Sequence, residues 1–126
     1  MQRIDPAHLT LRPFEILDVE WALLVAGSER PNPMTVSWGG LGTLWNRPVA
    51  TVYVRPTRHT FSLLEAEPSF TLNFLPEPFR GALDLCGSRS GRDLDKWKAA
   101  EQTLARPRFI VCTRDNRPSV ADSDLP

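Results

Sequence analysis

Three short segments of the chain alternate apolar and polar residues with the period of two that is typical of β-strands. These segments are residues 34–38, 48–55 and 69–75. A fourth segment, residues 21–28, is apolar on both faces. A strand of that kind must be covered on both sides, so we expect either a helix or a second subunit to pack against it.

The segments between and after these strands predict three short helices. A helix over residues 58–67 follows Thr57, which is a suitable N-cap. Two more are expected over residues 76–85 and 93–100, and the G-G-L-G sequence at residues 39–42 predicts a tight turn. Antiparallel strands with helices inserted between them are typical of a small barrel with helical decoration.

The two ends of the chain carry weaker patterns. The first twenty residues contain two prolines and predict an arm with at most one short strand. Residues 109–113 could form one more strand, and the polar residues after Asp115 are typical of a disordered tail. We therefore expect one domain over residues 1–105 and a divergent, partly disordered tail over residues 106–126.

Composition narrows the class of protein. A length of 126 residues suits a single domain, and 12 prolines disfavour long helices. The 15 basic residues balance the 15 acidic ones, which argues against a general nucleic-acid partner. The longest apolar run is about six residues, far short of a membrane span, and no signal peptide is visible. We expect a cytoplasmic protein with reduced thiols and no membrane partner.

The polar faces of the strands carry hydroxyl, amide and guanidinium groups, on Thr35, Ser37, Arg55, Thr71 and Asn73. They could simply face water, or they could line a site for a phosphate-bearing ligand. Two loops favour the ligand site. R-P-T-R-H-T at residues 55–60 places two arginines at a helix start, and G-S-R-S-G-R-D at residues 87–93 repeats that chemistry.

Other kinds of chemistry find little support in the sequence. The chain has no P-loop, no dinucleotide fingerprint, no metal-ligand spacing and no serine-hydrolase elbow. His59 is interpreted as a solvated residue of a first helical turn, and Cys86 as a small buried packing residue. No catalytic side chain and no metal ligand are therefore predicted. Of the tryptophans, Trp38 or Trp45 could stack on a planar ligand, although packing is the simpler role.

Four motifs in order resemble the flavin reductase-like, or flavoredoxin, family. They are N-P-M-T-V-S-W-G-G, W-N-R-P-V-A-T-V-Y-V-R-P-T-R-H-T, S-F-T-L-N-F-L-P and L-C-G-S-R-S-G-R-D-L-D-K-W. The resemblance covers residues 21–97. It implies a mainly β fold with inserted short helices, namely an antiparallel FMN-binding split β-barrel that is usually a homodimer. Members generally continue with further strands, so we expect the barrel to be incomplete at the C-terminus.

The resemblance also implies a set of FMN-binding residues. Thr35, Ser37 and Trp38 would lie along the flavin ring and ribityl chain, and Asn73 would donate toward the flavin or the ribityl hydroxyls. Arg55, Arg58 and Thr60 would hold the phosphate, and the loop with Ser88, Ser90 and Arg92 would close over the site.

The function implied is that of a flavin reductase-like oxidoreductase. Electrons would pass from NAD(P)H through bound FMN to a small-molecule or protein acceptor, with the chemistry supplied by the cofactor. Two alternatives stay open from the sequence: a non-enzymatic FMN-binding electron carrier, and an inactive truncated family member.

Overall fold

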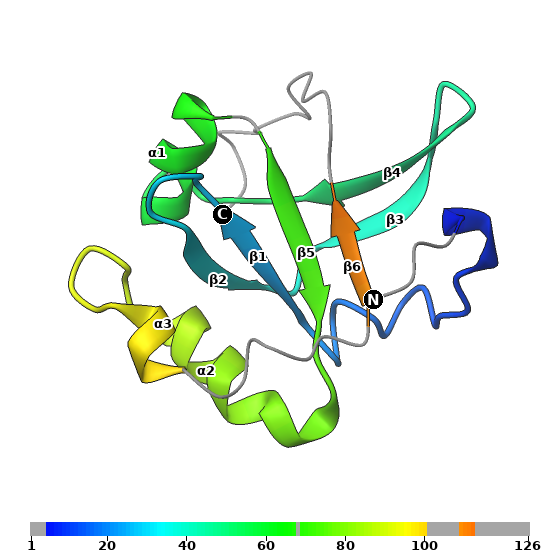
Figure 1. Cartoon of the computed structure of the whole chain (residues 1–126). Coiled ribbons are helices and arrows are strands. Elements are labelled where there is room, and N and C mark those ends of the chain that lie inside the picture. Colours follow the sequence, from blue (N-terminus) through cyan, green and yellow to red (C-terminus); the bar gives the residue numbers. More distant parts are fainter. Residues whose placement is uncertain (1–4, 68, 101–108, 113–126) are drawn as a thin grey trace.

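The computed structural model describes residues 5–67, 69–100 and 109–112 (Figure 1). Short helices and loops connect the strands. In chain order the elements are η1 (Pro6–His8), β1 (Ala22–Ala26), β2 (Asn32–Val36), β3 (Gly39–Leu44), β4 (Arg47–Val52), α1 (His59–Ala66), β5 (Phe70–Phe74), η2 (Glu77–Phe79), α2 (Arg80–Ser88), α3 (Lys96–Ala99) and β6 (Phe109–Cys112). The predicted fold class, mainly β with inserted short helices, is confirmed.

All strand pairs are antiparallel and form two sheets. One sheet has the order β2-β1-β5-β6, and β3 pairs with β4 in a separate hairpin. The hairpin extends away from the larger sheet at one side of the molecule (Figure 1). Within the described ranges the two sheets do not join into a closed barrel.

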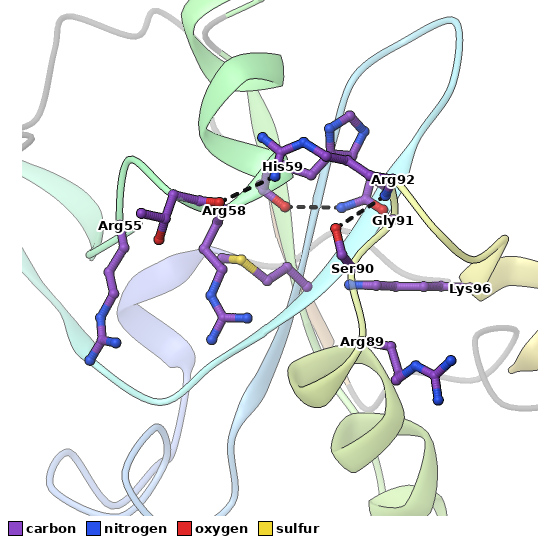
Figure 2. Close-up of a pocket in the computed structure, with 12 residues that line it drawn as sticks. Arg55, Arg58, His59, Arg89, Ser90, Gly91, Arg92 and Lys96 are labelled. Atoms are coloured by element: carbon purple, nitrogen blue, oxygen red, sulfur yellow. Dashed lines mark hydrogen bonds between the residues drawn. The ribbon is translucent and has the colours of Figure 1, made fainter.

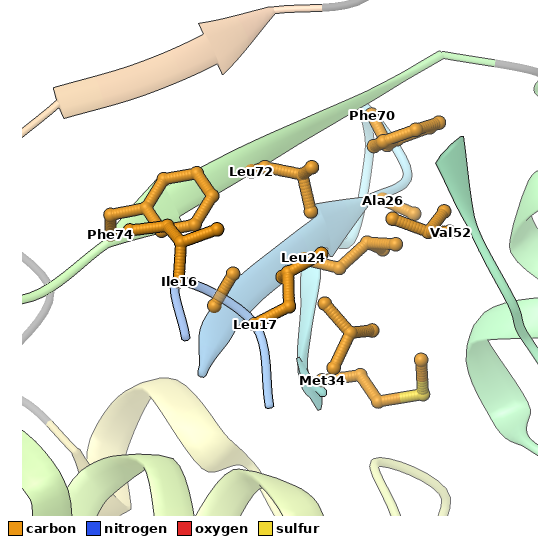
Figure 3. Close-up of a cluster of buried hydrophobic side chains, with 11 residues drawn as sticks. Ile16, Leu17, Leu24, Ala26, Met34, Val52, Phe70, Leu72 and Phe74 are labelled. Atoms are coloured by element: carbon orange, nitrogen blue, oxygen red, sulfur yellow. The ribbon is translucent and has the colours of Figure 1, made fainter. Parts of the chain in front are cut away.

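Strand β1 is buried on both faces, as its sequence predicts. Leu24 and Ala26 point into the larger core cluster, where they meet Leu72 and Phe74 of β5 (Figure 3). Leu23 points to the opposite face and joins a second cluster that includes residues of α2. The expected cover is therefore the helix α2, and no second subunit is needed for it.

The prediction of a tight turn at the G-G-L-G sequence is wrong. Residues 39–42 lie inside β3, and the chain reverses at Trp45 and Asn46 instead. Both residues have positive φ angles, 52° and 58°, as a two-residue hairpin turn requires. Asparagine tolerates this backbone conformation. The prediction placed the turn at the nearby glycines and did not consider the asparagine.

The other boundaries agree with the sequence to within a few residues. The helix predicted after Thr57 begins at His59, with Arg58 at its N-cap position and no side-chain cap. The strand predicted over residues 109–113 is observed as β6. The N-terminal arm forms η1 and turns, and it adds Ile16 to the core. The proposed boundary near residue 105 and the tail after Asp115 lie outside the described residues.

No helix in the described part of the chain is long and apolar enough to cross a membrane.

Candidate functional site

A pocket of about 240 Å³ lies where four segments meet (Figure 2). These segments are the start of β2, the approach to α1, the loop after α2, and the first residue of α3. The pocket is lined by Asn32, Met34, Arg55, Thr57, Arg58, His59, Thr60, Arg89, Ser90, Gly91, Arg92 and Lys96. The pocket therefore brings together the two arginine-containing loops that were identified from the sequence, at residues 55–60 and 87–93.

The lining of this pocket is strongly cationic. Four arginines and one lysine contribute to it, and no aspartate or glutamate does. Hydroxyl groups of threonine and serine residues lie among the cations. The chain as a whole has no net charge. The positive charge is therefore concentrated locally at this pocket, which favours an anionic ligand.

Lys96 is the most unusual of these cations because it is only 3% exposed. Its Nζ donates to the carbonyl oxygens of Pro33, at 2.9 Å, and Cys86, at 2.8 Å. Burial lowers the pKa of Lys96, and the nearby positive charge of Arg58 lowers it further. No carboxylate within the described residues pairs with it.

The Cys86 thiol does not supply the missing negative charge. Burial raises the pKa of Cys86, so the thiol stays neutral at physiological pH even though the positive charge of Lys96 opposes that shift. A buried ammonium without a counter-ion is costly unless a ligand provides one. The surroundings of Lys96 thus fit an anion in the pocket.

The loop after α2 is held against the approach to α1 by a small hydrogen-bond network. Asn32 Nδ2 donates to Thr60 Oγ1 at 3.0 Å, and both side chains are buried. Arg92 Nη1 donates to the carbonyl of Thr57 at 3.3 Å, and its backbone N–H donates to Ser90 Oγ at 3.2 Å. These bonds, drawn in Figure 2, fix the spacing of the two arginine loops.

The outer arginines have weaker ties to the protein. Arg58 Nη1 donates to the carbonyl of Gly87 at 3.3 Å. The guanidinium of Arg55 lies 5.3 Å from the centre of the Trp38 ring, in a cation–π contact. Trp38 is 48% exposed, so part of this residue next to Arg55 is open to solvent.

The structure places five of the ten predicted FMN-binding residues in this pocket. They are Arg55, Arg58, Thr60, Ser90 and Arg92.

The other five, Thr35, Ser37, Trp38, Asn73 and Ser88, do not line the pocket. Thr35 Oγ1 donates to the carbonyl of Leu83, and Asn73 Nδ2 donates to the carbonyl of Leu23. Ser88 Oγ donates to the carbonyl of Leu85 at the end of α2, at 3.5 Å. Their contacts with a flavin stay a prediction.

Sequence reasoning did not select several residues that line the pocket. The lining residues that were not among the predicted site residues are Asn32, Met34, Thr57, His59, Arg89, Gly91 and Lys96. Lys96 directly follows the second arginine loop in D-L-D-K-W, but nothing in the sequence marks it as buried. His59, interpreted as solvated, is half-buried at the pocket wall.

Comparison with known proteins identifies relatives of this fold. Residues 21–123 match the family model described as flavin reductase like domain. Flavoredoxin of Desulfovibrio vulgaris (Miyazaki F) is similar, with a TM-score of 0.61 and 21% identity over 80% of this chain and 53% of that one. No curated protein matches the sequence.

Two further solved structures are similar at slightly higher identity. An FMN-binding protein from Thermus thermophilus, solved with bound 1-cyclohex-2-enone, has a TM-score of 0.58 and 27% identity over 79% of this chain and 53% of that one. Flavoredoxin from Methanosarcina acetivorans has a TM-score of 0.57 and 25% identity over 76% of this chain and 48% of that one. The chain thus spans about half the length of these structures.

Gly91 tests how tightly the pocket is built. A Cβ atom at this position would overlap Asn32 Oδ1, so either the loop or the Asn32 side chain must shift, which disturbs the hydrogen bond from Asn32 to Thr60. We expect Gly91→Ala to lower the free energy of unfolding by about 1–3 kcal/mol, the usual cost of an unpaired buried polar group. Urea denaturation measures this difference.

Gly81 is the matched control for the same substitution. It lies in α2 with nothing within 4 Å of an added Cβ. Gly81→Ala should leave stability unchanged or raise it by up to about 1 kcal/mol. Equal stabilities for the two variants would show that the loop has no fixed fit against Asn32.

Proposed function

Since the chain belongs to the flavin reductase-like domain family, we propose that its cationic pocket holds the phosphate of FMN. We further propose that the protein is an oxidoreductase that takes electrons from NAD(P)H through this flavin and passes them to a small-molecule or protein acceptor. The observation that carries the proposal is the pocket itself, with five cations and no carboxylate in its lining.

The groups in the pocket suit a phosphate monoester. Such a phosphate carries about two negative charges near neutral pH and has three acceptor oxygens. Lys96 offers a buried charge without a counter-ion, and Arg58 offers a guanidinium suited to bidentate contact. Helix α1 begins at the same place with no side chain capping its first turn, which leaves N–H groups for an anion.

The size of the pocket limits what it can hold. At about 240 Å³ it is smaller than most sites that enclose a whole cofactor. It suits the phosphate end of FMN, with the ring system outside it. Trp38, half-exposed and in contact with Arg55, is the residue we propose to lie against the ring.

When bound, the flavin would supply the redox chemistry by accepting a hydride from a nicotinamide. The residues of this chain would bind and orient the cofactor. No acid–base pair or nucleophile is required of the protein, which agrees with a pocket built from cations and hydroxyl groups.

The proposal is tested by cofactor binding and turnover in one set of variants. Arg58→Ala should weaken FMN binding by about 10- to 100-fold, because one charge-assisted hydrogen bond to the phosphate is lost. Riboflavin, which lacks the phosphate, should bind the variant and the parent equally. Quenching of flavin fluorescence measures both affinities, and NAD(P)H oxidation by FMN-loaded protein measures turnover.

Arg47→Ala is the matched control, because Arg47 is exposed at the start of β4 and does not line the pocket. It should change neither affinity. A parent protein that binds FMN but does not accelerate NAD(P)H oxidation above free FMN would favour an electron carrier. A protein that takes up no FMN would overturn the proposal.

The depressed pKa of Lys96 gives FMN binding a pH dependence. A phosphate dianion, which is present above the second pKa of the phosphate at about 6, favours the protonated lysine. Above that pH the contribution of Lys96 to FMN affinity is complete below the pKa of Lys96 and is lost as pH rises through it. That pKa lies below the value of about 10.4 for a free lysine. FMN affinity should therefore fall at a lower pH than a solvated lysine would allow, while riboflavin affinity follows a different, phosphate-independent profile.

Two variants separate Lys96 from its neighbours. Above about pH 7, where the phosphate is fully ionised, Lys96→Met should remove the phosphate-specific pH dependence. Cys86→Ala should keep it, since the thiol is the other titrating group beside the ammonium. Arg58 stays charged throughout this range. An unchanged pH profile in Lys96→Met would contradict the assignment.

We also propose a homodimer, supported by the exposed β3–β4 hairpin. Two-stranded hairpins are marginally stable alone. This one carries Leu44, 55% exposed, and Trp45, 85% exposed, at its tip. Trp45→Asn should shift the protein toward monomer in sedimentation equilibrium, because asparagine keeps the positive φ of the turn while removing apolar surface. Phe14→Asn, which alters the N-terminal arm, should not; equal shifts would rule out the hairpin as the interface.

A further inference from the structure

The positive charge of the pocket exceeds what one phosphate monoester can neutralise. Five cationic side chains line it, without a carboxylate among the lining residues. FMN brings about two negative charges. About three positive charges would remain, and although water and salt screen those of the exposed arginines, the positive potential they leave attracts a second anionic group.

The arginines differ in how far the protein already uses them. Arg58 and Arg92 each donate to a backbone carbonyl, and Arg55 lies over the Trp38 ring. The side chain of Arg89 makes no hydrogen bond or ion pair within the described residues and is exposed at the pocket rim, while its backbone N–H caps α2. Its guanidinium is thus a fully available anion-binding group.

The free arginine lies away from the others. In Figure 2 the side chain of Arg89 lies at one end of the pocket and that of Arg55 at the opposite end, with the amine of Lys96 between them. Arg89 also directs its guanidinium outward from the segment that follows α2. The inner position around Lys96 and Arg58 and the outer position at Arg89 are therefore two separate places for anions.

We propose that Arg89 binds a second phosphate group beside the flavin phosphate. This inference rests on the proposed function, since the inner position is assigned to FMN. Two ligands of the same chemistry could bring the second phosphate. The 2′-phosphate of a nicotinamide co-substrate, which distinguishes NADPH from NADH, would add about two negative charges. The second phosphate of a flavin dinucleotide, which distinguishes FAD from FMN, would leave the total charge nearly unchanged but extend it over two phosphate groups.

Isothermal titration with defined probes separates these sources. FMN-loaded protein is titrated with adenosine 2′,5′-bisphosphate and with 5′-AMP, and cofactor-free protein with FAD and with FMN. If the nicotinamide brings the phosphate, the bisphosphate binds about 10- to 100-fold tighter than 5′-AMP. If the dinucleotide brings it, FAD binds tighter than FMN by a similar factor.

Arg89→Ala should abolish whichever preference the parent shows while changing FMN affinity less than Arg58→Ala does. Lys98→Ala is the control for general electrostatics, because Lys98 is exposed on α3 and does not line the pocket. It should keep the preference.

Three results would overturn the inference. The parent could show neither preference, Arg89→Ala could retain the preference, or Arg89→Ala could weaken FMN itself as strongly as Arg58→Ala. In each of these cases FMN binding by the parent would still support the proposed function. A parent that binds no FMN would overturn the proposed function as well.

Discussion

The buried ammonium of Lys96 is the interaction on which the candidate site depends. Its two hydrogen bonds go to the carbonyl of Pro33 in β2 and to that of Cys86 in α2, so one cation links this strand to this helix next to the pocket. Removing such a charge from water is expensive, and two neutral carbonyls compensate it only in part. The fold therefore holds a positive charge whose natural complement is an anion entering the pocket.

The sheet makes this arrangement possible because β1 is buried on both faces. The larger cluster around Leu24 stabilises one face, and this leaves the other face free to hold α2 through the cluster of Leu23, Leu83 and Cys86. Helix α2 is thereby fixed in direction, and the loop that follows it reaches Asn32 and the start of α1. Apolar packing on one side of a single strand thus determines where the arginines of residues 89–92 lie.

The strands and the two arginine-containing loops could be predicted from the sequence, because they depend on the order of residues within short segments. Alternation located β2, β4 and β5, and the doubly apolar segment of β1 indicated a covering layer. Arginines next to a proline and next to glycines indicated the two anion loops. The hairpin turn at Trp45 and Asn46 was missed because its positive φ angles are supplied without glycine.

The composition of the pocket was harder to predict because it depends on packing between distant segments. Lys96 and Asn32 become site residues only when α3 and β2 lie together, and neither carries a local signal of burial. Conversely, Thr35 and Asn73 stand on the polar faces that suggested a ligand surface, yet their side chains bond to carbonyls within the fold. Periodicity identifies which residues share a face but not what covers that face.

The order in which anions fill the pocket follows from burial. An anion at Lys96 gains most, since the interaction there is least screened by water. Once about two charges are neutralised, the remaining cations still present a net positive potential at the exposed rim. The loop of residues 89–92 borders both positions, and Arg92 ties it to Thr57. In the proposed arrangement, the inner phosphate and the phosphate at Arg89 would contact the same loop, so the two positions would share one backbone segment.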